Sequence, residues 1–247
     1  MLLDLVGGSG DVKTAFISLL LSLPVILLAL TVHEFAHGYV AYLCGDSTAK
    51  AFGRLSLNPM KHLDPFGALC MLIAGFGWAK PVPVNTRYLR KPKRDMMLVA
   101  LAGPAANFLL AFLAAAVTAL IEALAAKYDM FLIFGNMVYY TDNIGLALYF
   151  VYIVFRTMVM LNIGLGLFNL IPLPPLDGSK ILAGLLPSHL AMRYVQIERY
   201  TRQIFLAVML LSFTGVLSIL LSPLNWARGA IEDVFIGLFE FLFKGIG

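Results

Sequence analysis

The feature that most limits the fold of this chain is an apolar run over residues 14–43 that contains His33, Glu34 and His37. The run is longer than the roughly 20 residues that a helix needs to cross a bilayer. Imidazole and carboxylate groups are costly inside a membrane, so their presence in such a run indicates a functional site. The sequence therefore predicts a membrane-spanning helix that carries chemistry.

The spacing of the two histidines predicts a metal centre. His33 and His37 are four residues apart, so a helix places both rings on one face, one turn apart. From there, one nitrogen of each ring can bind the same metal ion. Glu34 projects about 100° around the helix from His33, which makes it a poor third ligand but places it to act as a base on a metal-bound water.

The composition indicates a polytopic membrane protein. Of 247 residues, 60% are hydrophobic and 13% are charged, whereas soluble domains carry about 25% charged residues. Further apolar runs at 95–126, 144–170 and 203–222 predict three more spans, and 229–243 predicts a C-terminal interfacial amphipathic helix. We therefore expect an all-α polytopic membrane protein with about four transmembrane helices.

Residues 66–86 are apolar, but glycines and prolines interrupt them too often for a spanning helix. Pro81 and Pro83 alternate with valines, a pattern that suits an extended edge segment. Irregular backbone at membrane depth is tolerated only where it is buried in protein or lines water. We expect a re-entrant or interfacial, strand-like segment at 77–84 near the active site, whose edge could hold an unwound substrate as an added strand.

Basic residues predict the orientation. Nine lie in 44–95 and four in 179–202, whereas the loop 127–143 contains only Lys127. The positive-inside rule places the first two segments in the cytoplasm and, with four spans, puts both termini outside. These loops account for the net charge of +4, and no aromatic and basic pattern indicates nucleic-acid binding. The first and third spans then end on the same side of the membrane.

Asp177 is the best candidate for a third metal ligand. It follows the third span in a proline-rich break beside Gly178, on the same side of the membrane as His33 and His37. A catalytic zinc usually takes three protein ligands and keeps one open position, so we predict one Zn²⁺ per chain, although other divalent ions accept the same donors. Asn169 could donate to the substrate backbone or to a developing oxyanion.

The chain also resembles a known family. The motif from His33 to His37, followed by Asn169-Leu170-Ile171-Pro172 and Leu176-Asp177-Gly178, is similar to the paired motifs of the site-2 proteases, which are intramembrane zinc metalloproteases. Less specific parts of the resemblance are the stretches Gly103–Asn107, 58–65 and 77–84. The match covers about residues 14–186. The resemblance implies that His33, His37 and Asp177 are zinc ligands and that Glu34 is the catalytic base.

The resemblance is to the minimal form of the family, which lacks the PDZ or CBS domain of other members. We therefore expect a single membrane-embedded domain over residues 1–247, with a catalytic core at about 14–186 and the last span and interfacial helix within 203–243. The expected location is a prokaryotic cell membrane, with the active site toward the cytoplasm.

Three residues have more than one interpretation. His62 lies in a family-like loop and is either part of the substrate site or bonded to local backbone. Asn107 either approaches the active site or forms hydrogen bonds between helices, and we favour the second role. Arg156 lies in the middle of the third span, where it could pair with a carboxylate, line a water path or extend toward the surface.

These features favour an intramembrane zinc endopeptidase that hydrolyses peptide bonds in or near transmembrane segments of other membrane proteins, with Glu34 activating a zinc-bound water. The expected partners are the lipid bilayer and such substrates. A metal-ion transporter or channel could use the same ligands, and an inactive membrane scaffold could retain them. Glu34 separates these alternatives, because a transporter could keep partial function with Gln at this position, whereas a protease should lose cleavage and still bind zinc.

Overall fold

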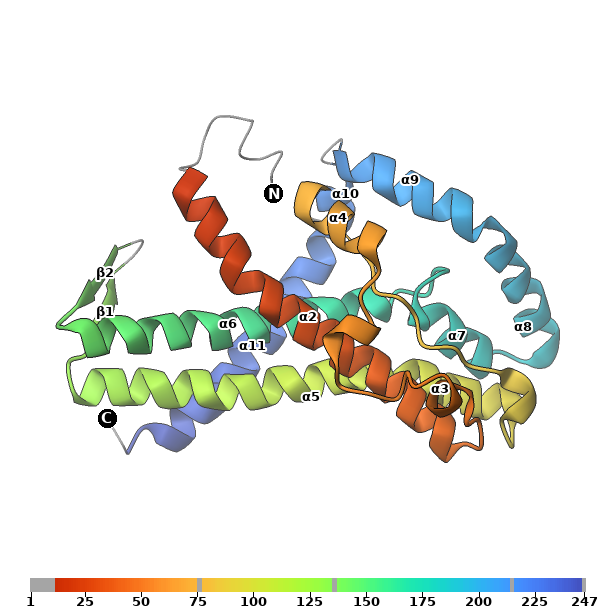
Figure 1. The fold of residues 1–247 in the computed structure, drawn as a ribbon, viewed down its shortest axis with the longest axis horizontal. Coiled ribbons are helices and arrows are strands. Elements are labelled where there is room, and N and C mark those ends of the chain that lie inside the picture. The colour runs from red at the N-terminus through yellow and green to blue at the C-terminus, as the bar shows by residue number, and fades with distance from the viewer. Residues whose placement is uncertain (1–11, 75–76, 135–136, 214–215, 246–247) are drawn as a thin grey trace.

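Long helices form the body of the protein (Figure 1). The computed structural model describes residues 12–74, 77–134, 137–213 and 216–245. Within these ranges, three helices are long and apolar enough to cross a membrane: α2 (Val12–Leu43), α5 (Pro92–Lys127) and α6 (Asn143–Asn169). The chain is therefore an all-α polytopic membrane protein, as its composition predicts.

Helices α5 and α6 are antiparallel neighbours joined by a β-hairpin, and α2 crosses them diagonally (Figure 1). The hairpin pairs β1 (Phe131–Phe134) with β2 (Met137–Tyr140) in a region that we expected to be a plain loop. Phe131 is buried, and its ring contacts Tyr149 and Tyr152 of α6. Aromatic packing against α6 therefore holds the hairpin on the end of the helix pair.

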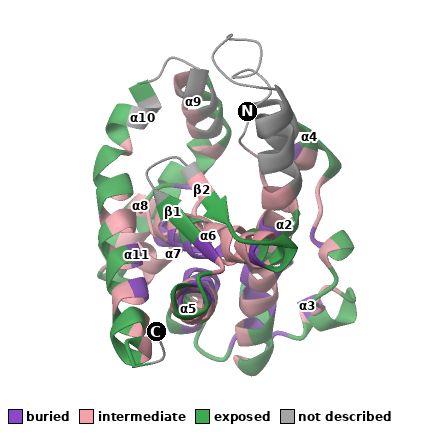
Figure 2. Cartoon of the chain, turned by 90° about the vertical axis from the view of Figure 1, so that its left-hand side faces the viewer, coloured by how far each residue is buried: buried purple, intermediate pink, exposed green. Residues whose placement is uncertain are grey.

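The core lies where α2, α5 and α6 meet, and small residues build much of it. Figure 2 shows the buried residues gathered between these helices, while their outer faces are exposed. The buried cluster consists of Val25, Ala111, Ala114, Ala115, Met158, Val159, Ile163 and Ile236. Alanine side chains let helix backbones approach closely, which is the usual basis of helix association in membranes.

Helix α11 (Ser222–Phe243) packs on this bundle. It begins before the interfacial helix that we expected at 229–243, and it contributes Ile236 to the core. The guanidinium of Arg156 on α6 lies 3.1 Å from the Glu232 carboxylate of α11. The structure thus selects the first of the three interpretations of Arg156, pairing with a carboxylate.

The region of the expected fourth span contains two short helices. Helix α9 (Thr201–Phe213) and helix α10 (Val216–Leu220) flank residues 214–215, which lie outside the described ranges. The residues on either side of this gap, from 203 to 213 and from 216 to 220, are helical. Within the described residues, no single helix in this region reaches spanning length. Helix α8 (Ser188–Val195) and η3 (Gln196–Tyr200) lead into α9.

The segment between α2 and α5 folds alongside α2. It contains α3 (Thr48–Ala51), η1 (Pro59–Lys61), α4 (Pro65–Ala74) and η2 (Thr86–Tyr88). Residues 77–84 form neither helix nor regular strand, and one isolated antiparallel bridge pairs Ala79 with Leu63. The prediction of a strand-like segment is supported by this one bridge, and the described part of the segment joins no regular sheet.

Candidate metal centre

Three side chains that are far apart in the sequence converge in the interior. His33 and His37 come from α2, and Asp177 is the first residue of α7 (Asp177–Leu185). Asp177 Oδ2 lies 3.1 Å from Nε2 of each histidine, and the two Nε2 atoms are 3.0 Å apart. All three residues are buried, and the group can bind a metal ion.

Hydrogen bonds on the far side of each ring fix the histidine tautomers. His37 Nδ1 lies 2.7 Å from the Val99 carbonyl, which can only accept a hydrogen bond. His33 Nδ1 lies 2.6 Å from Asn107 Oδ1. Both Nδ1 atoms therefore carry the proton, and both Nε2 atoms present an electron pair toward Asp177. Two nitrogen pairs facing a carboxylate oxygen need a cation among them, so this donor set fits a divalent metal.

Asp177 suits a third ligand. Burial raises the pKa of its carboxyl, while hydrogen bonds and positive charge from protonated His33 and His37 rings lower it overall in the metal-free protein. A bound metal takes the place of those ring protons, because the ligating carboxylate must be ionised and the ligating imidazoles neutral. Two histidines and one carboxylate match the ligand sets of catalytic zinc, which leave one position open for water or substrate.

A glycine on α5 makes room for the two rings. A Cβ atom on Gly103 would lie 2.5 Å from His37 Nε2 and 2.6 Å from His33 Cε1. Real Cβ atoms do not come so close to ring atoms, so a side chain here would displace the ligands or the helix. Gly103 therefore allows α5 to pack directly against the metal-binding face of α2.

A tight turn after α6 delivers Asp177. A Cβ atom on Gly178 would lie 2.3 Å from the Leu170 carbonyl oxygen and 2.4 Å from that of Ile171. Ser179 also donates through its hydroxyl to the Leu176 carbonyl at 2.7 Å. The glycine and serine that follow Asp177 thus hold the start of α7 against the end of α6, which directs the carboxylate toward α2.

Glu34 points toward the segment at 77–84. Its Oε2 accepts a hydrogen bond of 2.8 Å from the Val82 amide. The side chain of Val82 lies close to Gly38 of α2, where a Cβ atom would be 3.1 Å from Val82 Cγ1. The segment therefore lies next to the metal-binding turn of α2, as we expected, and it holds the carboxylate of the candidate base.

The three further candidates from the sequence have different positions. Asn107 lies at the site, where it contacts His33. Asn169 donates to the Leu165 carbonyl of its own helix at 3.0 Å. His62 lies 2.7 Å from the Ser56 carbonyl. Of these three, only Asn107 is hydrogen-bonded to one of the converging side chains.

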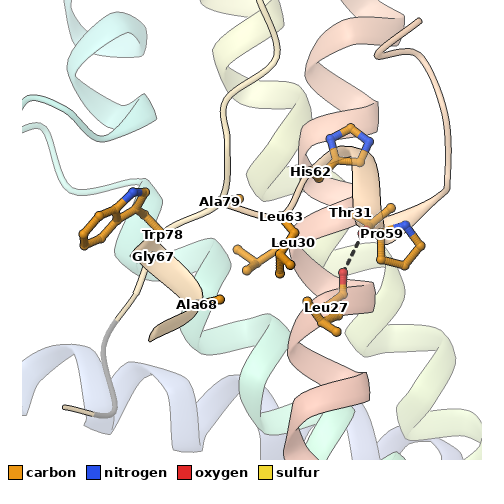
Figure 3. Close-up of a pocket in the computed structure, with 10 residues that line it drawn as sticks. All are labelled: Leu27, Leu30, Thr31, Pro59, His62, Leu63, Gly67, Ala68, Trp78 and Ala79. Carbon is orange, nitrogen blue, oxygen red and sulfur yellow. Dashed lines mark hydrogen bonds between the residues drawn. The ribbon is translucent and has the colours of Figure 1, made fainter. Parts of the chain in front are cut away.

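His62 lines a small pocket between α2 and the loop residues that cover it (Figure 3). Leu30 and Thr31 of α2 also line it, and the hydroxyl of Thr31 donates to the Leu27 carbonyl at 2.6 Å. The converging side chains of His33, His37 and Asp177 are not among the lining residues. This pocket is therefore separate from the candidate metal centre.

Sequence reasoning missed three groups in or near the site. The Val99 carbonyl and the Val82 amide are backbone groups, which leave no signal in a sequence. Asn162 is not hydrogen-bonded to the candidate ligands. It is fully buried and accepts a hydrogen bond from Asn107. The signal that could have identified it is a polar side chain inside an apolar span, which usually marks a functional position.

Comparison with known proteins supports the metal centre. The family model for peptidase family M50 matches residues 21–213, most of the chain. A Bacillus subtilis relative named "Putative zinc metalloprotease YwhC" is 41% identical over 216 residues, covering 87% of this chain and 90% of the relative. A Mycolicibacterium smegmatis relative named "Putative zinc metalloprotease Rip2" is 31% identical, covering 62% of this chain and 52% of the relative.

No solved structure matches the chain at a significant level, so the assignment rests on the family match, the relatives and the geometry. The matched range, residues 21–213, contains both histidines, Glu34 and Asp177. The chain therefore belongs to peptidase family M50, the site-2 protease family, and is a zinc metalloprotease embedded in a membrane.

Proposed function

We propose that the chain is an intramembrane zinc endopeptidase that cuts the transmembrane segments of other membrane proteins. The observation that carries the proposal is the convergence of Asp177 Oδ2 of α7 with the Nε2 atoms of His33 and His37, which lie on a helix that can span the membrane. These three side chains would hold the zinc ion. A protease site at this depth serves substrates that are themselves within the bilayer.

Glu34 is the catalytic base of the proposed reaction. Zinc, when bound, polarises the scissile carbonyl and lowers the pKa of a coordinated water to about 7. Glu34 accepts a proton from the attacking water and then donates it to the leaving amine. The Val82 amide orients the Glu34 carboxylate through the bond at 2.8 Å.

The arrangement of the helices supports a site that opens toward the cytoplasm. The C-terminal end of α2, the N-terminal end of α5 and helix α7 lie together at one end of the bundle, and the hairpin lies at the other (Figure 1). The basic segments at 44–95 and 179–202 belong to the end that holds the metal centre. The positive-inside rule therefore orients this end to the cytoplasm of a prokaryotic cell and the N-terminus outside.

The test uses the purified chain reconstituted in lipid vesicles with a reporter protein that has one transmembrane segment. We expect cleavage within that segment, loss of cleavage when zinc is removed, and recovery when zinc is restored. Asp177→Ala should bind less zinc and cleave nothing. Zinc-dependent cleavage of soluble loops alone, with every transmembrane segment left intact, would contradict the intramembrane assignment and leave the metalloprotease class standing.

A further inference from the structure

A chain of buried amides connects α6 to the metal centre through α5. Asn162 on α6 and Asn107 on α5 are fully buried, and His33 on α2 is 4% exposed. Uncompensated polar groups are costly in such surroundings, so each donor and acceptor needs a partner. The three residues satisfy one another across three helices.

Backbone carbonyls, which can only accept, determine the direction of each hydrogen bond that links Asn162, Asn107 and His33. Asn162 Nδ2 donates to the Met158 carbonyl at 2.9 Å, so Asn162 Oδ1 must face Asn107. Asn107 Nδ2 donates to that oxygen at 2.8 Å and to the Ala29 carbonyl at 3.2 Å. Asn107 Oδ1 is then the atom that faces His33 Nδ1, at 2.6 Å.

We propose that Asn162 is a positioning residue of the metal centre. Asn162 fixes the orientation of the Asn107 amide, Asn107 fixes the tautomer of His33, and His33 thereby keeps the Nε2 electron pair for the metal. The inference rests on the proposed role of His33 as a zinc ligand. Asn162 itself needs no contact with metal or substrate.

The alternative orientation of Asn107 shows what Asn162 prevents. With the amide turned by half a rotation, its NH₂ group would face His33 Nδ1, and the ring proton would move to Nε2 and block metal binding. That rotation would also bring Asn107 Oδ1 against two acceptors, the Ala29 carbonyl and Asn162 Oδ1. Without Asn162, only the hydrogen bond of 3.2 Å to the Ala29 carbonyl holds the Asn107 amide in this orientation.

A general packing role for Asn162 predicts a different result. Interhelical amides in membrane proteins commonly contribute to stability alone. In that case, replacing Asn162 would lower the stability of the metal-free protein without a selective change in metal affinity. Outer partners of metal-bound histidines, in contrast, typically change metal affinity 10-fold to 100-fold when they are removed.

The test measures the zinc dissociation constant of the full chain in detergent by competition with a chelator. Asn162→Leu should raise this constant about tenfold and change the visible spectrum of bound Co²⁺. Asn162→Asp keeps an oxygen facing Asn107, and as a neutral acid in this buried position it can donate to the Met158 carbonyl in place of the amide, so it should restore the affinity to within about threefold of wild type. Asn162→Ala also removes this oxygen and introduces a smaller side chain than leucine. It should show the same loss of zinc affinity and serves as the test if the leucine variant does not fold.

The matched control is Thr118→Val on α5. Thr118 is fully buried, and its hydroxyl donates to the Ala114 carbonyl at 2.9 Å, within the same helix. This substitution should leave zinc affinity within twofold of wild type. The inference is overturned if Asn162→Leu and Asn162→Ala bind zinc as wild type does, or if Thr118→Val weakens zinc as much as they do. A chain that binds zinc but cleaves nothing would contradict the proposed function without affecting this inference.

Discussion

Gly103 lies against the rings of His33 and His37 and leaves no room for a side chain. Replacing it with alanine would place a Cβ atom 2.5 Å from His37 Nε2, so the ligands or α5 must move. We expect Gly103→Ala to lower stability by about 1–3 kcal/mol and to weaken zinc binding. Zinc content after dialysis and thermal unfolding in detergent measure the two effects.

Gly237→Ala provides the control for that substitution. Gly237 lies within α11, and nothing lies within 4 Å of an added Cβ atom. Alanine in a helix interior is favoured over glycine by roughly 0.5–1 kcal/mol, so this variant should be slightly more stable and retain its zinc. If both variants retained zinc equally, this would contradict the close packing of α5 against His33 and His37 at Gly103.

Motifs in the sequence identify the candidate ligands, but they do not predict the contacts that orient those ligands. The spacing of His33 and His37, and the position of Asp177 after a span on the same side, predict a convergence that the structure contains. The partners that orient the two rings could not be predicted in the same way. One is the Val99 carbonyl, which is a backbone group, and the other is Asn107, whose contact with His33 depends on how closely α5 crosses α2.

At the scale of elements, the segment at 77–84 acts through its backbone. Val82→Pro removes the amide that donates to Glu34, because proline has no N–H. A hydrogen bond to a charged group contributes about 1.5–3 kcal/mol, so we expect cleavage to fall by about 10-fold to 100-fold. Zinc content should remain unchanged, since the lost hydrogen bond joins Val82 to Glu34 and not to any of the three candidate ligands.

Val82→Ala is the matched control for the backbone claim. Alanine keeps the N–H and removes two methyl groups from a buried side chain. We expect some loss of stability but a smaller loss of cleavage than Val82→Pro causes. Equal cleavage rates in the two variants would show that the Val82 amide does not orient Glu34.

Helix α11 is part of the packed bundle, and a pair of truncations tests this. Ile236 is 5% exposed and belongs to the core cluster, whereas Leu238 is 46% exposed. Ile236→Ala should lower the free energy of unfolding by about 2 kcal/mol because it leaves a cavity, and Leu238→Ala should change it by less than about 0.5 kcal/mol. Unfolding by detergent titration compares them, and equal effects would mean that α11 does not pack as described.

The elements show where reasoning from apolar runs succeeds. Long runs predict α2, α5 and α6 to within three residues at each end, because length and hydropathy determine a spanning helix almost alone. They do not predict the paired strands β1 and β2, where Phe131 packs on α6. This packing is a contact between elements, which a single apolar run does not encode.

For the whole molecule, the orientation predicts which ends of the helices are accessible from each side. In a background with Cys44 and Cys70 replaced by serine, Arg87→Cys and Leu132→Cys place one thiol at each end of the bundle, both at exposed positions. In intact cells, a membrane-impermeant maleimide should label the second variant and not the first. Permeabilised cells, in which both should react, provide the control, and the reverse pattern would invert the proposed orientation.

The central claim is that zinc and Glu34 together perform the hydrolysis at this site. The most direct measurement compares wild type with Glu34→Gln for zinc content and for cleavage of a transmembrane reporter. We predict about one zinc per chain in both proteins and a fall in cleavage of at least about 10²-fold in the variant. A Glu34→Gln variant that cleaves as fast as wild type, or a wild type that cleaves equally well without metal, would contradict the account.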